Sequence, residues 1–197
     1  MSKQLVLFIA AATAALASAA SAAAYVTPPV DRSGVHSLTT CLYSGTTPPP
    51  PGVLGGNGDS KGTISPTTDL WLSAGWGANT QSQVNNFLGA QYGSIVISQY
   101  DGTNIGPTVK SVNWGDPSTK KQTDVSLWTA PAAMNDPTLN GGKPFWNTKF
   151  FWNVGQLASG TYWVSPNFVL TQAQFDGSTT VKAGPYFTTG CELVVGS

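Results

Sequence analysis

The chain has 197 residues, of which nine are Lys or Arg, nine are Asp or Glu and one is His, so its formal net charge is zero. Only 9% of the residues are charged, against roughly 25% in an average soluble domain, whereas the apolar share of 41% is ordinary. So few basic residues exclude a nucleic-acid-binding protein, which needs several Lys and Arg against phosphates, and a polybasic membrane-surface segment.

The first 24 residues have the pattern of a secretory signal peptide. A single Lys precedes an apolar run at 5–17, and small residues at 22–24 form an A-x-A cleavage site before Tyr25, with a second such site at 17–19. The run is shorter than the about 20 residues that a membrane-spanning helix needs, and no second long apolar run follows. The sequence therefore predicts a secreted, extracellular protein without a transmembrane segment once 1–24 has been removed.

Residues 25–65 are expected to form an extended arm. The segment is rich in Pro and Gly, and four consecutive prolines at 48–51 favour polyproline II geometry and prevent pairing inside a sheet. It contains Cys41, and the other cysteine, Cys191, lies near the opposite end of the chain. In an oxidising compartment such a pair forms one disulfide. We therefore expect a Cys41–Cys191 bond that ties the arm to the last strand.

Residues 66–197 are predicted to form one all-β domain. From residue 69 onward apolar and polar residues alternate as in half-buried strands, and turn signals such as D-G and N-G-G separate the runs. Short strands with this spacing indicate an antiparallel β-sandwich. The expected strands are 69–76, 94–100, 108–114, 124–128, 148–154, 161–164, 167–170 and 191–195.

One short stretch has a helical pattern instead. Val84, Phe87 and Leu88 share one helix face, Asn79 or Thr80 is a suitable N-cap, and Gly89 is a suitable end. The predicted domain therefore carries one short helix.

A six-residue motif narrows the fold. Residues 157–162, Leu-Ala-Ser-Gly-Thr-Tyr, have the form L-x-x-G-x-Y, which resembles the tyrosine corner of Greek-key sandwiches. In such corners a Tyr that opens a strand hydrogen-bonds back to the preceding loop. The resemblance implies an immunoglobulin-like or fibronectin-type sandwich and implies nothing about activity.

Groups for acid–base catalysis are scarce. His36 lies in the predicted arm, no G-x-S-x-G element is present, and Glu192 is the one Glu. Several Asp residues stand in D-G or D-P turns, which explains them without catalysis. We predict no catalytic residue, no cofactor and no metal site. The alternatives are a hydrolase that uses a pair of Asp, and a calcium site with Asp101, Asn104 and Asp176. The eight Asp are Asp31, Asp59, Asp69, Asp101, Asp116, Asp124, Asp136 and Asp176.

The seven Trp are the strongest functional signal in the sequence. Alternation along the predicted strands directs Trp71, Trp128, Phe151 and Trp163 outward, and Trp146 is expected in a loop. Exposed aromatic rings stack on sugar rings or on partner side chains. These five residues are therefore the candidate ligand-binding residues. The alternative is that the arm or the segment 116–149 covers them.

The sequence is compatible with three functions. The first is a non-catalytic extracellular binding module for cell-surface or cell-wall polysaccharide, or for another surface protein. It requires Trp71, Trp128 and Trp163 to gather on one exposed face. The second is a structural, self-assembling surface protein whose arm adds a strand to a neighbour. The third is the hydrolase with an Asp pair.

Overall fold

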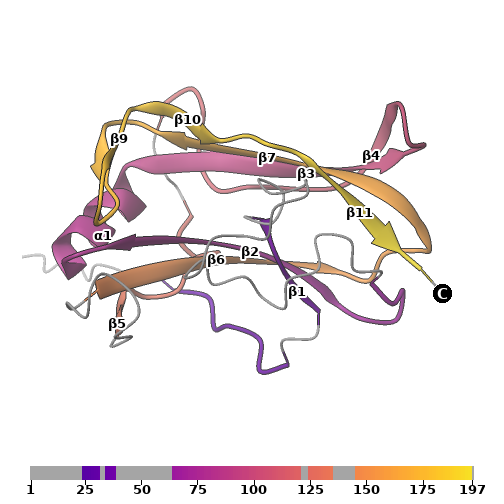
Figure 1. Ribbon diagram of the computed structural model, residues 1–197, viewed down its shortest axis with the longest axis horizontal. Coiled ribbons are helices and arrows are strands. Elements are labelled where there is room, and N and C mark those ends of the chain that lie inside the picture. The colour runs from indigo at the N-terminus through magenta and orange to yellow at the C-terminus, as the bar shows by residue number, and fades with distance from the viewer. Residues whose placement is uncertain (1–23, 32–33, 39–63, 121–123, 135–144, 197) are drawn as a thin grey trace, which may run out of the picture.

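The computed structural model describes residues 24–31, 34–38, 64–120, 124–134 and 145–196. They form a mostly β protein with one helix, as the sequence predicted (Figure 1). In chain order the elements are β1 (Val35–Ser37), β2 (Leu70–Ala78), α1 (Gln81–Gly89), β3 (Gln91–Tyr100), β4 (Ile105–Asn113), β5 (Ala132–Met134), β6 (Phe145–Gly155), β7 (Gly160–Leu170), β8 (Gln174–Phe175), β9 (Thr180–Val181), β10 (Gly184–Phe187) and β11 (Cys191–Val195).

The strands form two main sheets that lie one above the other (Figure 1). One is four-stranded, in the order β1-β2-β6-β5. The other is five-stranded, in the order β10-β7-β3-β4, with β11 also paired to β7. Among the described strands the pairings are antiparallel except for β1 against β2, which is parallel. The predicted antiparallel sheets are thus confirmed.

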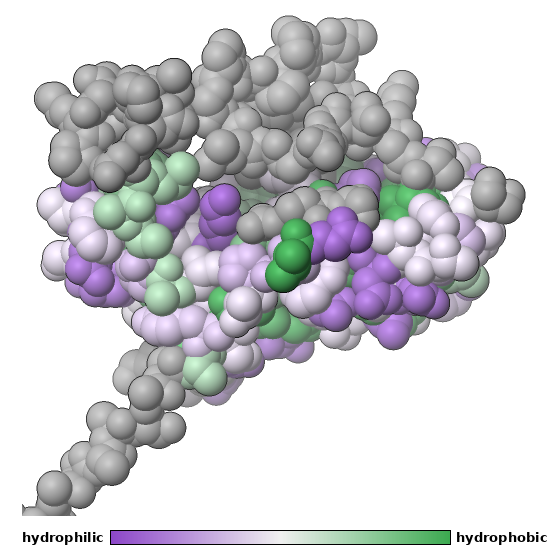
Figure 2. All heavy atoms as spheres, turned by 90° about the horizontal axis from the view of Figure 1, so that it is seen from below, coloured by the Kyte–Doolittle hydropathy of each residue, from purple (hydrophilic) through white to green (hydrophobic). Residues whose placement is uncertain are grey.

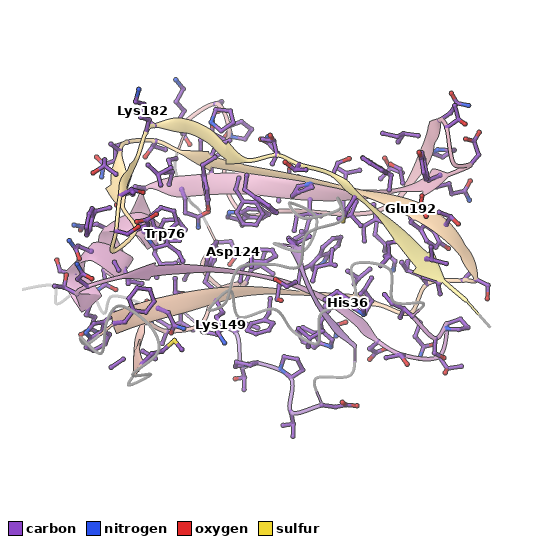
Figure 3. The ribbon with its side chains drawn as sticks, in the orientation of Figure 1. His36, Trp76, Asp124, Lys149, Lys182 and Glu192 are labelled. Atoms are coloured by element: carbon purple, nitrogen blue, oxygen red, sulfur yellow. The ribbon has the colours of Figure 1, made fainter. Side chains whose placement is uncertain are left out.

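The core between the sheets is largely aromatic. Trp114 packs against Phe150 and Phe168, with ring centroids 4.8 and 4.6 Å away. Trp76 stacks on Phe87 of α1 at 4.3 Å, so the helix closes one end of the core (Figure 3). Burial of such large rings supplies most of the hydrophobic stabilisation of a small β domain.

The helix begins and ends as its sequence predicted. Thr80 is the N-cap: its Oγ1 accepts a hydrogen bond from the Gln83 amide at 3.2 Å, and Oε1 of Gln83 accepts one from the Thr80 amide at 3.1 Å. This reciprocal capping box satisfies two backbone donors that a helix start otherwise leaves unpaired. Val84, Phe87 and Leu88 form the buried face.

Three of the expected strands differ in the structure. Residues 124–128 form a turn, closed by a hydrogen bond from the Trp128 amide to the Val125 carbonyl at 2.9 Å, and only Trp128 bridges to β6. The expected strands 161–164 and 167–170 are one strand, β7, which runs through Pro166. Pro166 falls between the residues that pair with β11 and those that pair with β10. On its other side Pro166 lies opposite Ile95 of β3, so the gap between β11 and β10 gives it the edge position at which a missing N–H is tolerated.

The predicted arm contributes a strand of its own. β1 lies within 25–65 and pairs with β2, and the Val26 amide donates to the Trp128 carbonyl at 2.8 Å. Cys191 opens β11. Cys41 lies outside the described residues, so the disulfide stays a prediction. The signal peptide at 1–24 also stays a prediction, because residues 1–23 lie outside the described part of the chain. In the part of the chain that is described, no helix has the length and apolar character to cross a membrane.

Candidate functional site

The five aromatic residues predicted to bind a ligand do not form one face. The strand registers place Trp71 and Phe151 on the outer side of the four-stranded sheet and Trp163 on the outer side of the five-stranded sheet. Trp128 points into the core, and Trp146 lies in β6 rather than in a loop. The carbohydrate-binding hypothesis drawn from the sequence required Trp71, Trp128 and Trp163 to gather on one exposed face. The structure does not meet that requirement, so a carbohydrate site on this protein must use a different set of residues.

Two of the five residues are buried. Trp128 is 1% exposed because the turn at 125–128 breaks the alternation, and its bridge to Phe150 puts both side chains on the inner face. Phe151 has the expected outward direction but is also 1% exposed. Its neighbours in register on that face, Ser73 and Ser37, are buried as well. At the centre of this sheet an outward direction therefore does not mean exposure.

Trp163 forms an aromatic pair with Tyr100 on the outer face of the five-stranded sheet. Trp163 in β7 lies opposite Ser98 in β3, and Tyr100 follows two residues later on the same face of β3. The ring centroids are 5.2 Å apart with an interplanar angle of 48°, and both side chains are half-buried. A Cβ on Gly190 would come within 2.6 Å of the indole Nε1, so the backbone before β11 packs closely against Trp163 and holds it.

A hollow of about 410 Å³ adjoins this pair; we call it the Tyr100 hollow. Amide and hydroxyl side chains line it beside the ring. Trp163 itself does not line the hollow, but its partner Tyr100 does, and Thr161 lies two residues before Trp163 on the same face of β7, so the hollow adjoins the aromatic pair. The lining residues that matter here are Gln99, Tyr100, Asn104, Ser159 and Thr161.

Hydrogen bonds fix the walls of the Tyr100 hollow. The Tyr162 hydroxyl donates to the Ala158 carbonyl at 2.7 Å, which is the bond expected of a tyrosine corner. Across the hollow, Oδ1 of Asp101 accepts the amides of Thr103 at 2.8 Å and Asn104 at 2.6 Å. The backbone and side chain of Asn104, with the Thr103 amide, hold the pKa of Asp101 below its usual value. Asp101 therefore serves the β3–β4 turn, as its D-G context indicated.

A second hollow, of about 400 Å³, lies at the start of β2; we call it the Trp71 hollow. Trp71 is half-buried, and its amide donates to the Gly34 carbonyl at 2.8 Å. Nε2 of Gln156 donates to the Thr67 carbonyl at 3.1 Å across the same hollow. The lining residues that matter here are Asp31, Thr67, Asp69, Trp71 and Gln156.

The other candidates from the sequence are dispersed. His36 lies in β1, and Figure 3 shows it well separated from Asp124 and from Glu192 in β11. Asp101 and Asp176 belong to hairpins at opposite ends of the molecule, so the proposed calcium ligands are not brought together (Figure 1). Within the described ranges no group of three or more His, Cys, Asp or Glu is placed to hold a metal ion.

Sequence reasoning missed Tyr100 and Gln99, named Asn104 only as a calcium ligand, and missed that Asp31 and Asp69 share a hollow. Alternation alone gives Tyr100 an outward direction, but only the β3–β7 register brings it to Trp163. Seen from the four-stranded sheet, the described surface is mostly hydrophilic or neutral, with separate small hydrophobic spots (Figure 2). Neither protein-family models, nor curated proteins, nor solved structures include a match to this chain.

Proposed function

We propose that this is a secreted, non-catalytic module that binds neutral carbohydrate through Trp163, Tyr100 and the Tyr100 hollow. One observation supports the proposal most directly: the ring of Tyr100 packs against Trp163 and also lines the Tyr100 hollow. Aromatic faces stack on the C–H faces of sugar rings, and a hollow of this volume falls within the range of small-ligand sites. A sugar unit held in the hollow would contact the ring of Tyr100.

The polar groups of the hollow match sugar hydroxyls. Gln99 and Asn104 offer amide donors and acceptors, and Ser159 and Thr161 offer hydroxyls that do both. Apart from the turn residue Asp101, the described residues that line the hollow are uncharged. Such a lining favours a neutral ligand, because an ionic ligand would lose its hydration without gaining an opposite charge.

Two further proposals accompany this function. The pattern of 1–24 supports export. An immunoglobulin-like arrangement of the two sheets is supported by the L-x-x-G-x-Y motif together with the hydrogen bond from Tyr162 to Ala158.

The test is binding to a panel of cell-wall and surface polysaccharides, followed by tryptophan fluorescence and calorimetry. We expect Tyr100→Ala and Trp163→Ala each to weaken binding by about tenfold, the loss of one aromatic stacking contact. The matched control is Tyr92→Ala, on the same face of β3 but eight residues away, at the other end of the strand. Unchanged fluorescence across the panel, or equal effects of all three substitutions, would overturn the proposal.

A second candidate function rests on a separate observation. Asp31 and Asp69 both line the Trp71 hollow, and a pair of carboxylates is what most glycoside hydrolases use for catalysis. A hydrolase would release reducing ends from a polysaccharide, and Asp69→Asn would abolish that release. Absence of release by the unmodified protein from every bound polysaccharide would dismiss this candidate.

A further inference from the structure

The two hollows lie on either side of one short connection. Gln156, which lines the Trp71 hollow, directly follows β6, and Ser159, which lines the Tyr100 hollow, directly precedes β7. Both hollows are therefore built at the end of the molecule where the chain passes from one sheet to the other (Figure 1). Three residues span at most about 11 Å of chain, so the two walls are close.

The connection between β6 and β7 is anchored to the core, which fixes the distance between the two hollows. Leu157 is 7% exposed and belongs to the core, while the Ala158 carbonyl is held by the Tyr162 hydroxyl. Neither wall can move far without breaking one of these contacts. The spacing between the hollows is thus part of the fold.

The Trp71 hollow shares with the first site an aromatic ring with amide and hydroxyl neighbours, and it differs in having two carboxylates, those of Asp31 and Asp69, in its lining. Its indole is half-buried and its backbone is paired to the arm at Gly34. A Cβ at Gly34 would collide with the carbonyl oxygen of Asp69, so the arm is held against β2 by an approach that glycine permits. Gln156 and Thr67 offer amide and hydroxyl groups beside the ring. An indole with such neighbours can stack on a sugar ring and bond its hydroxyls.

We propose that the Trp71 hollow is a second carbohydrate subsite, so that the natural ligand is a polysaccharide that binds in both hollows at once. This inference rests on the proposed function of the Tyr100 hollow. Two linked subsites raise affinity for a polymer far more than for a short fragment, because binding at the first raises the effective concentration at the second. The two fixed hollows would make the module select long chains.

The experiment compares a short oligosaccharide with its polymer by calorimetry. For the unmodified protein we expect two short ligands per chain, and one each for Trp71→Ala and Tyr100→Ala. Polymer affinity should fall at least about tenfold in either variant. Gln156→Ala, which removes an exposed amide of the Trp71 hollow and leaves the indole, should reduce only the second binding event. It covers the case in which Trp71→Ala fails to fold.

Three other outcomes would overturn either the second subsite or the proposed function. One short ligand per chain, lost in Tyr100→Ala and kept in Trp71→Ala and Gln156→Ala, overturns the second subsite and leaves the proposed function standing. No binding of either ligand by the unmodified protein refutes the proposed function itself. Release of reducing ends that Asp69→Asn abolishes would also overturn the proposal, because the Trp71 hollow would then be a hydrolytic site.

Discussion

At the scale of single residues, the buried tryptophans of the core differ in whether their indole N–H is hydrogen-bonded. Nε1 of Trp114 donates to Oε1 of Gln91 at 2.7 Å, and both side chains are fully buried. In contrast, the indole Nε1 atoms of Trp76 and Trp128 are buried without a hydrogen-bond partner in the structure as described. A buried donor left unpaired costs about 1–3 kcal/mol, so these indoles are held by packing rather than by hydrogen bonds.

The pair of Trp114 and Gln91 can be tested by substitution. Trp114→Phe removes a donor from the buried Gln91 amide and leaves a smaller ring, so we expect a loss of about 2–4 kcal/mol in the free energy of unfolding. Urea unfolding followed by far-UV circular dichroism measures the loss. Trp71→Phe is the matched control, because that indole lines a surface hollow. Equal losses in the two variants would show that the buried hydrogen bond contributes nothing.

At the scale of elements, aspartates close the loops. In the β8–β9 hairpin, Oδ1 of Asp176 accepts the amides of Ser178 at 2.9 Å and Thr179 at 2.7 Å. Partial burial would raise the pKa of Asp176, but the hydrogen bonds from Thr179 and Ser178 outweigh it and hold the pKa below 3.8. The hydrogen bonds of this loop therefore favour the ionised form of the Asp176 carboxylate.

This hairpin predicts acid sensitivity. A pKa lower in the folded than in the unfolded chain gives stability that is present above the unfolded value of 3.8 and is lost as the pH falls through the folded value. Asp176→Asn keeps an acceptor oxygen but cannot ionise, so its stability should decline less on acidification. Urea unfolding at intervals between about pH 2 and pH 6 checks this. Parallel pH curves for the two proteins would contradict it.

The sequence predicted the secondary-structure elements better than it predicted which side chains are exposed. The capping box and apolar face of α1 are local signals, and so is the alternation of Leu70, Leu72 and Trp76, which are buried as expected. Phe151 is buried although alternation directs it outward, and the inward direction of Trp128 follows from the turn at 125–128, which the apolar residues of 124–128 did not indicate. Local patterns carry no information on either.

For the same reason, only part of the candidate site could be predicted from the sequence. Trp163 and Trp71 were found because surplus aromatics are visible in composition. Tyr100 became a site residue only through the register of β3 against β7, and the Trp71 hollow only through the pairing of β1 with β2. Register between distant strands is set by the whole sheet, so neither arrangement could be derived from spacing.

At the scale of the whole molecule, β4 forms one edge of the five-stranded sheet and is well exposed there. All its residues except Val112 are exposed, including Ile105 at 57% and Val109 at 37%. An edge strand presents unpaired backbone groups and invites strand addition. Three features oppose that here: Pro107, Lys110 and the register shifts between β3 and β4.

Removing this protection should cause association. We expect the unmodified protein to elute as one species across a wide concentration range, and Pro107→Thr/Lys110→Val to form concentration-dependent dimers or larger species. Light scattering after gel filtration distinguishes them. Lys182→Val, which removes a lysine beside β9 at the far end from the β3–β4 turn, is the control (Figure 3). Association of the unmodified protein would instead favour the self-assembling alternative, and a monomeric double variant would show that β4 is protected by other means.

The position of β7 also governs when the fold can be completed. β7 pairs along one edge with β3, which precedes it by some sixty residues, and along the other with β10 and β11. Its first half, which carries Trp163 beside the Tyr100 hollow, acquires its outer neighbour only from β11. During synthesis that edge therefore stays open until residue 195 has emerged. A chain interrupted before 191 would expose Trp163 and an unpaired strand together, so incomplete copies should be the aggregation-prone ones.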